Sequence, residues 1–158
     1  MLLKLPQKIV KILKKKKLKI SFAESCTGGM LASQITSVSG ASEVFKLGMV
    51  TYSNQAKIDT LHVPKEILKE YGAVSKECCE IMAKNIQKIG KSHIGISITG
   101  VAGPKGGTLK KPIGLVYVGI SKNSVFEFKK FLFNKKLSRA EIQKKTCSKT
   151  FKLIQQLI

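Results

Sequence analysis

Apolar and polar residues recur along the chain with the two periods of regular secondary structure. Leu5, Ile9 and Ile12 are spaced by three or four residues, which predicts an amphipathic helix, whereas Ile20 and Phe22 alternate with polar residues as in a strand. The same patterns continue to the C-terminus. They predict helices over residues 5–15, 30–35, 55–61, 64–72, 75–90 and 138–158, and strands over residues 18–22, 44–53, 94–98, 113–120 and 126–133.

The order of these elements predicts an α/β fold. Helices and strands alternate at first and strands follow one another later, which favours a mixed sheet with helices on both faces, a three-layer α/β/α arrangement. Residues 113–120 form an almost continuous apolar run, as in an interior strand. No repeat, linker or change of composition divides the sequence, so we expect residues 1–158 to form a single domain.

Two details of the pattern predict local geometry. The sequence Ser138–Glu141 has the form of a helix capping box. In the last predicted strand, Phe126 and Phe128 share one phase of alternation, whereas Phe131 and Phe133 share the other. This change of phase predicts a register break between the two pairs.

Cysteine and histidine usage gives no sign of a metal site. No two cysteines have the Cys-x-x-Cys spacing, and the two histidines have no ligand spacing to them. We therefore expect no metal and no cofactor, and we expect buried, reduced thiols at the adjacent cysteine pair, which lies within a predicted helix. The four cysteines of the chain are Cys26, Cys78, Cys79 and Cys147, and its two histidines are His62 and His93.

The composition is that of a folded domain. Of the 158 residues, 43% are hydrophobic and 24% are charged, and the length permits a core without metal or disulfide support. No apolar run approaches the roughly 18 residues of a membrane span, and the lysine-rich N-terminus lacks the order of a signal peptide. We therefore expect a cytoplasmic protein without a membrane partner.

The net charge of +20 makes a nucleic-acid partner worth testing against the sequence. The charge comes from 28 lysines and one arginine, Arg139, and the chain has no tryptophan. Proteins that read nucleic acids add arginines for base edges and aromatic residues for stacking, so nucleic acid is not the expected partner. A solvated lysine-rich surface explains the net charge at least as well as a nucleic-acid-binding surface does. Such a surface would bind polyanions weakly and attract the phosphate of a small substrate.

The strongest local signal for chemistry is the stretch 23–29, Ala-Glu-Ser-Cys-Thr-Gly-Gly, between a predicted strand and a predicted helix. A serine at such a turn is surrounded by backbone N–H groups and the positive end of the helix dipole, which suit a phosphate or the oxyanion of acyl transfer. Gly28 and Gly29 permit close approach and positive φ. From spacing alone, a helix start capped by Ser25 or Thr27 is an equally good interpretation.

A serine hydroxyl needs a base to become a nucleophile. Neither histidine is flanked by a carboxylate in the sequence, which leaves lysine, whose pKa would have to fall well below about 10.4 through burial or neighbouring positive charge. Lys57 follows residues 50–54 at the end of a predicted strand, where active-site groups of open α/β sheets gather. Taken alone, this residue is better interpreted as a solvated loop lysine. Tyr52 would assist proton transfer or simply pack.

Two further features have both a functional and a structural interpretation. Residues 100–107 contain four glycines and one proline, with neither the phosphate-loop nor the dinucleotide-binding spacing. This loop would line a pocket beside Ser25 or form a tight surface turn, and its length and its place after a strand favour the pocket. Arg139 would hold a phosphate or a buried carboxylate with its planar fork, or form an ion pair with Glu141.

Taken together, several stretches of the chain resemble the CinA C-terminal domain family, whose enzymatic members are nicotinamide-nucleotide amidases. Order and spacing agree over roughly residues 5–155, and several long motifs in the right order are far more specific than any one of them. The matching stretches are 23–29, 48–57 (Gly-Met-Val-Thr-Tyr-Ser-Asn-Gln-Ala-Lys), 72–75 (Gly-Ala-Val-Ser), 100–107 and 111–114 (Lys-Pro-Ile-Gly).

The resemblance implies hydrolysis of the carboxamide of nicotinamide mononucleotide to nicotinate mononucleotide and ammonia, a step of pyridine nucleotide salvage, at a serine–lysine site without a metal. It implies that Ser25 is the nucleophile, Lys57 the general base and Tyr52 a helper. It also implies a small-molecule nucleotide substrate and a homo-oligomer, a dimer or larger. The oxyanion hole and substrate site would include Cys26, Thr27, Gly28, Gly29, Thr51, Asn54, Gly100, Gly103, Gly106 and Arg139.

Two departures from the family pattern bear on these expectations. Family members often have Gly-Asp-Arg before the last helix, where this chain has Leu137-Ser138-Arg139, and a second arginine four residues later is replaced by Gln143. A phosphate or dimer contact made there is therefore not expected to carry over unchanged. Longer members also carry an N-terminal domain similar to molybdopterin-binding proteins, for which 158 residues leave no room.

Two alternative functions remain open from the sequence. The first is a catalytically silent member of the family that binds a protein or nucleic-acid partner, as the net charge of +20 suggests. Its signature would be salt-dependent retention on DNA without amidase activity. The second makes Cys26 the nucleophile, and Cys26→Ser would then lose activity.

Overall fold

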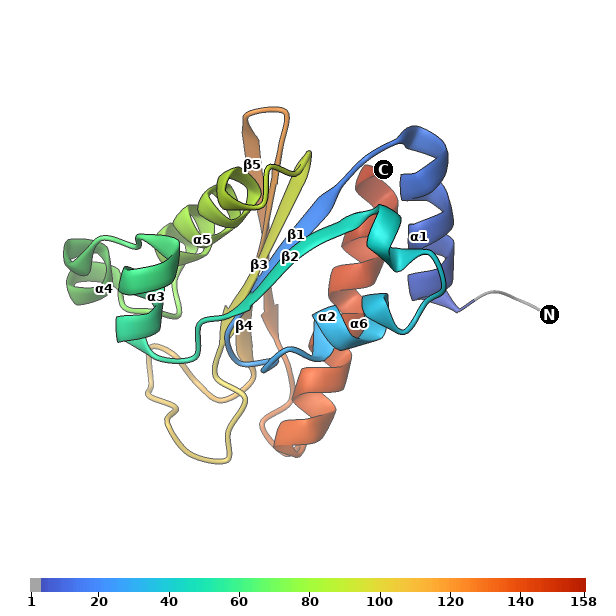
Figure 1. Cartoon of the computed structure of the whole chain (residues 1–158). Coiled ribbons are helices and arrows are strands. Elements are labelled where there is room, and N and C mark those ends of the chain that lie inside the picture. The colour runs from blue at the N-terminus through green and yellow to red at the C-terminus, as the bar shows by residue number, and fades with distance from the viewer. Residues whose placement is uncertain (1–3) are drawn as a thin grey trace.

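The sheet that organises the fold is built from β1 (Ile20–Glu24), β2 (Phe45–Val50), β3 (Ile94–Gly100), β4 (Leu115–Lys122) and β5 (Val125–Leu132). A computed structural model describes residues 4–158 and places these five strands in the order β2-β1-β3-β4-β5 (Figure 1). β1 pairs in parallel with both β2 and β3, whereas β4 is antiparallel to β3 and to β5. The predicted mixed sheet is therefore confirmed.

Helices cover both faces of this sheet, namely α1 (Leu5–Lys16), α2 (Met30–Thr36), α3 (Asn54–Leu61), α4 (Lys65–Tyr71), α5 (Lys76–Ile89) and α6 (Arg139–Leu157). Figure 1 shows α3, α4 and α5 on one side and α1, α2 and α6 on the other. One core cluster joins Leu13 of α1, Leu31 of α2 and Phe151 of α6. A second joins Leu61 of α3 to Met82 of α5, so the predicted three layers are present.

Small residues let α5 approach the sheet closely. The isoleucines of β3 join the core cluster of α1, α2 and α6, whereas Gly95 and Ser97 of the same strand face α5. A Cβ at Gly95 would lie 2.2 Å from the carbonyl oxygen of Ala83, so only glycine fits there. The Ser97 hydroxyl donates to the carbonyl of Cys79 at 2.6 Å, which fastens α5 to the strand.

The register break predicted for the last strand is wrong. β5 pairs with β4 residue by residue along its whole length, without a bulge. Phe126 lies against Gly119 on the face covered by α5, whereas Phe131 packs against the core cluster on the other face. The phase changes because this outer strand carries apolar side chains on both of its faces, and the pairing itself does not shift.

Cap residues account for most of the observed boundaries. Ser75 caps α5, and the predicted capping box of Ser138 and Glu141 begins α6. β4 starts two residues later than predicted, after a turn in which Gly114 has a φ of 91°. β2 ends at Val50, so the three residues before α3 leave the sheet.

Two further findings concern the helices of the described chain. Between residues 4 and 158, none is both long and apolar enough to cross a lipid bilayer. Cys78 and Cys79 of α5 are fully buried free thiols, as predicted for the adjacent pair, and Cys147 of α6 is another.

Candidate active site

The carboxyl ends of the three parallel strands β1, β2 and β3 meet at one edge of the sheet. β1 continues into α2 on one face, and β2 continues into α3 on the opposite face (Figure 1). This divergence opens a crevice beyond the strand ends, which is where open α/β sheets bind ligands. Ser25, Thr51 and Val101 directly follow the three strands and lie at this edge.

Ser25 is held in place by the turn that follows it. Its N–H donates to the carbonyl of Ile98 on β3 at 3.1 Å, and its carbonyl accepts from the N–H of Gly28 at 3.0 Å. Gly28 and Gly29 have φ values of 58° and 95°, which glycine adopts without strain. Ser25 is only 8% exposed, so its hydroxyl lies at the buried floor of the crevice.

The N-terminus of α2 is occupied by a side chain that was not predicted as a site residue. Glu24, the last residue of β1, is 1% exposed. Its carboxylate accepts from the backbone N–H groups of Gly29, Leu31 and Ala32 at 3.1, 3.0 and 2.8 Å. The Thr27 hydroxyl donates to the same carboxylate at 2.6 Å. This carboxyl group therefore satisfies the free N–H groups at the start of the helix from inside the protein.

The donors left at the turn are the backbone N–H groups of Cys26 and Thr27. Gly28 and Gly29 use their N–H groups inside the turn, so they shape it without offering free donors. Within the described residues, no atom of another residue accepts a hydrogen bond from the N–H of Cys26 or Thr27. Two free N–H groups beside a serine hydroxyl are the donors that an oxyanion hole requires.

The carbonyl side of this turn is held by α6. The side-chain amide of Gln143 donates to the carbonyl of Cys26 at 2.9 Å. Gln143 is the residue that the resemblance described above identified as a departure from an expected arginine. In this chain the position therefore supplies a neutral tether between the last helix and the turn that carries Ser25.

Lys57 approaches Ser25 from α3 and is 1% exposed. Its Nζ lies 2.9 Å from Ser25 Oγ and donates to the carbonyl of Thr51 at 2.7 Å. Both partners are uncharged, and no acidic side chain of residues 4–158 forms a salt bridge with it. Burial lowers the pKa of Lys57 below its ordinary value of 10.5, against smaller raising effects from the thiols of Cys78 and Cys26.

The Ser25–Lys57 pair has the geometry for direct proton exchange. A neutral amine at Nζ would accept the Ser25 hydroxyl proton through its lone pair while it keeps its N–H bond to Thr51. Because Lys57 is buried, it is not a solvated loop residue. The structure thus brings together Ser25 and Lys57, the two side chains for which the sequence predicted the roles of nucleophile and base.

Cys26 is poorly suited to nucleophilic attack. Burial raises the pKa of its thiol to about 12, although its own backbone N–H and the charge of Arg139 lower it slightly. The group therefore stays a thiol at neutral pH, and the thiolate is the reactive form. Ser25, by contrast, has a base within hydrogen-bond reach.

Arg139 and Tyr52 form a bridge beside the crevice. Arg139 donates from Nη1 to the carbonyl of Gly103 at 2.9 Å and from Nη2 to the Tyr52 hydroxyl at 2.7 Å. Tyr52 is 63% exposed, and no hydrogen bond within the described chain links it to Ser25 or Lys57. The structure therefore places Tyr52 in the wall of the site and not beside the base.

Ser25 opens onto a cavity of about 310 Å³, which suits a small-molecule ligand. Most of the glycine-rich loop lines it, so the loop forms a pocket wall, as the sequence favoured. Val74 also lines it and was not predicted, whereas Val101, Ala102 and Lys105 belong to the predicted loop but were not singled out. The lining residues are Ser25, Cys26, Tyr52, Val74, Gly100, Val101, Ala102, Gly103, Lys105, Gly106 and Arg139.

Six predicted site residues do not themselves line the cavity, namely Thr27, Gly28, Gly29, Thr51, Asn54 and Lys57. Asn54 is exposed at the start of α3. Thr51 is buried and acts through its backbone carbonyl, which holds Lys57.

The ion pair considered between Arg139 and Glu141 is not formed, because the Glu141 carboxylate accepts from the N–H of the α6 cap. Among residues 4–158, no group of three or more His, Cys, Asp or Glu side chains is placed to bind a metal ion.

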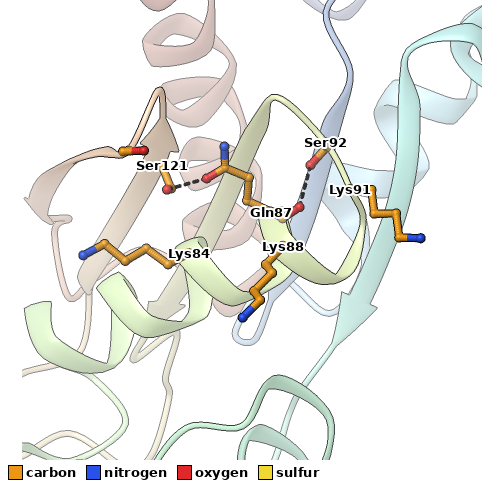
Figure 2. Close-up of a pocket in the computed structure, with 7 residues that line it drawn as sticks. Lys84, Gln87, Lys88, Lys91, Ser92 and Ser121 are labelled. Carbon is orange, nitrogen blue, oxygen red and sulfur yellow. Dashed lines mark hydrogen bonds between the residues drawn. The ribbon is translucent and has the colours of Figure 1, made fainter.

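A larger hollow of about 490 Å³ lies between the C-terminal half of α5 and the end of β4 (Figure 2). Its lining includes Lys84, Lys88 and Lys91, which gives it the charge of an anion site. Figure 2 shows the three ammonium groups pointing away from one another. The centre is closed by a hydrogen bond of 2.5 Å from Ser121 to Gln87. This surface therefore lacks the converging charges that a phosphate backbone would need.

Sequence comparisons show which proteins this chain is similar to. The profile of the CinA C-terminal domain matches residues 2–158. A relative from Clostridium perfringens, named as a competence-damage inducible protein, is 51% identical over 142 residues, which are 90% of this chain and 34% of the relative. A CinA-like protein from Dictyoglomus turgidum is 52% identical over 116 residues, 73% of this chain and 28% of the relative. The chain thus spans about a third of the length of the curated relatives it matches.

Solved structures share the fold over nearly the whole chain. The competence/damage inducible protein CihA from Agrobacterium tumefaciens has a TM-score of 0.93 at 33% identity, over 97% of this chain and 93% of that one. The competence-damaged protein (CinA) superfamily protein from Escherichia coli has a TM-score of 0.93 at 27% identity, over 98% and 88%. The α/β fold predicted from the sequence is therefore confirmed.

Proposed function

The chain belongs to the CinA C-terminal domain family, and from this we propose that it is a serine–lysine amidohydrolase. The proposed substrate is nicotinamide mononucleotide, whose carboxamide is hydrolysed to nicotinate mononucleotide and ammonia. The observation that carries the proposal is the buried 2.9 Å contact between Lys57 Nζ and Ser25 Oγ at the floor of the cavity. The cavity volume of about 310 Å³ also suits a ligand of mononucleotide size.

In the first step, neutral Lys57 takes the proton of Ser25 as Oγ bonds to the carboxamide carbon. The electron pair of the carbonyl moves onto its oxygen, and the N–H groups of Cys26 and Thr27 supply donors for that charge. The carbonyl of Thr51 keeps Nζ oriented and stabilises the ammonium that forms. Lys57 therefore acts as the base in this step, and its protonated form is the acid in the next step.

In the second step, the Lys57 ammonium returns the proton to the amide nitrogen, the C–N bond breaks and ammonia leaves. The product is an ester between Ser25 and the nicotinoyl group. Water then attacks this ester with Lys57 again as base, which releases the acid and restores the hydroxyl. Because burial lowers the pKa of Lys57, a larger fraction is neutral near physiological pH, and the rate should rise with pH until Lys57 is fully deprotonated.

The test is ammonia release from nicotinamide mononucleotide by purified protein, with EDTA in every reaction. We expect release that survives EDTA and falls by at least about 10³-fold in Ser25→Ala. Ser33→Ala, an exposed serine on α2, is the matched control and should behave as the parent. Release by folded Ser25→Ala at the parent's rate would remove Ser25 from the mechanism. No release by the folded parent would overturn the proposal, and retention on DNA would then be measured.

A further inference from the structure

The glycine-rich loop brings a second cation to the Ser25 cavity. Lys105 lines the cavity together with Arg139, and the described residues lining it include no acidic side chain. Lys105 is exposed, and no hydrogen bond or ion pair within residues 4–158 engages its ammonium. Glu24, directly before the nucleophile, does not line the cavity, and its oxygens are bonded at the start of α2. The cavity is therefore positively charged without an internal counter-ion.

The loop that carries Lys105 is tied to Arg139, and both residues line the same cavity. Gly103 and Gly106, on either side of Lys105, have φ values of 76° and 90°, so the chain bends on both sides of the lysine. The bond from Arg139 to the Gly103 carbonyl ties this part of the loop to the start of α6. A Cβ at Gly103 would lie 2.7 Å from the Ile113 side chain, so the first bend requires glycine.

Arg139 keeps both charge and donors for a ligand. Its bonded acceptors, the Gly103 carbonyl and the Tyr52 hydroxyl, are neutral and do not cancel the guanidinium charge. A guanidinium has more N–H donors than the two used here. A guanidinium held by two hydrogen bonds and a lysine ammonium that has none in the described chain, lining one cavity, are groups that suit the oxygens of a phosphate.

Exposure distinguishes the two ends of the cavity. Ser25 is 8% exposed at the floor, whereas Lys105 and Tyr52 are exposed at the rim. A ligand with its reacting amide at Ser25 would therefore extend outward toward the cations. We propose that Lys105 binds the phosphate of a phosphorylated amide, next to Arg139, and so makes the cavity prefer this substrate to its unphosphorylated counterpart. This inference rests on the proposed amidase function.

The experiment compares nicotinamide mononucleotide with nicotinamide riboside, which has the same amide and no phosphate. For Lys105→Ala, kcat/KM for the mononucleotide should fall about tenfold, mainly through KM, as expected for one charge-assisted contact at a partly open site. Turnover of the riboside should be unchanged, and Lys105→Arg should restore the preference. Lys110→Ala, an exposed lysine in the same connection that does not line the cavity, is the matched control.

Three results of the kinetic experiment would overturn the inference. Equal losses for both substrates, no loss for either, or the same loss in Lys110→Ala would show that Lys105 does not read the phosphate. If the parent hydrolyses neither amide, the proposed function fails separately, and calorimetry with nicotinamide mononucleotide decides the inference. Binding to the parent that weakens about tenfold in Lys105→Ala would support the phosphate contact. If nicotinamide mononucleotide does not bind, or binds equally well to Lys105→Ala, the inference is wrong.

Discussion

Replacing Lys57 by methionine should abolish turnover and also change how the stability of the fold depends on pH. Methionine keeps a long, unbranched apolar side chain but has no ammonium group. In the parent this group is buried, and its partners, the Ser25 hydroxyl and the Thr51 carbonyl, are uncharged. A buried positive charge without a carboxylate partner opposes folding unless it loses its proton.

The direction of the effect follows from counting protons in the two states. Burial lowers the pKa of Lys57 in the folded protein, whereas a lysine in the unfolded chain titrates near about 10.4. Between the two pKa values the unfolded state holds a proton that the folded state lacks, so the free energy of unfolding rises with pH. The slope is at most about 1.4 kcal/mol per pH unit for one proton. The methionine variant lacks this titration, so the parent should gain stability relative to it as the pH approaches about 10.4.

Urea denaturation of both proteins, from neutral pH to about pH 10 with a reductant present, measures this difference. The other titrating groups are shared by the two chains and cancel, apart from Cys26 and Cys78, which are coupled to Lys57; burial raises the pKa of these thiols to about 12 and about 11, so in the fold they titrate above this range. Lys69→Met, at an exposed position of α4, is the matched control, and its difference from the parent should not change with pH. If the Lys57→Met difference were equally constant, the ammonium would not be desolvated in the fold, and the argument for a low-pKa base would fail.

Three further changes probe the turn that carries the nucleophile. Glu24→Gln should lower the free energy of unfolding by about 3 kcal/mol, because the glutamine NH₂ group would face the N–H of Ala32 and the other hydrogen bonds would lose charge assistance. Urea denaturation measures this loss, and an unchanged denaturation midpoint would contradict it. Cys26→Ser should keep activity within about tenfold, since the thiol is protonated at neutral pH; a loss as large as that of Ser25→Ala would make the cysteine the nucleophile. Gln143→Leu should lower kcat by about threefold to tenfold with little change in KM, because the Cys26 carbonyl loses its hydrogen bond from α6. A change confined to KM would instead assign Gln143 to substrate binding.

Much of the fold was predictable because each element repeats its apolar residues with a single period. The isoleucines of β3 alternate with small residues, and both the strand and its burial follow from that alternation. The same rule failed in β5, where Phe126 and Phe131 serve opposite faces of one unbroken strand. Periodicity reports which face is apolar, and an outer strand with apolar side chains on both faces resembles a strand with a break.

The candidate site was predictable only in part. Ser25 was visible because its turn has a distinctive local sequence. The burial of Lys57 was not, because a lysine in a sequence is normally expected in solvent and only the tertiary fold shows that this one is buried. Glu24 was missed because its partners are N–H groups five to eight residues later. An acidic residue at the end of an apolar strand, just before a glycine turn, is the signal that would have found it.

The sheet ends in two strands, β2 and β5, that each have one edge unpaired within the described residues. Open edges are templates on which strands of other molecules can add, and they are a common start of aggregation. Lys46 stands within β2, and Lys129 and Lys130 stand at the middle of β5, all of them exposed. An ammonium at an open edge repels another copy of the chain and resists the loss of water that edge pairing requires. The lysine-rich composition therefore protects the newly made protein from sticking to itself, and neutralising those side chains by acetylation would remove that protection.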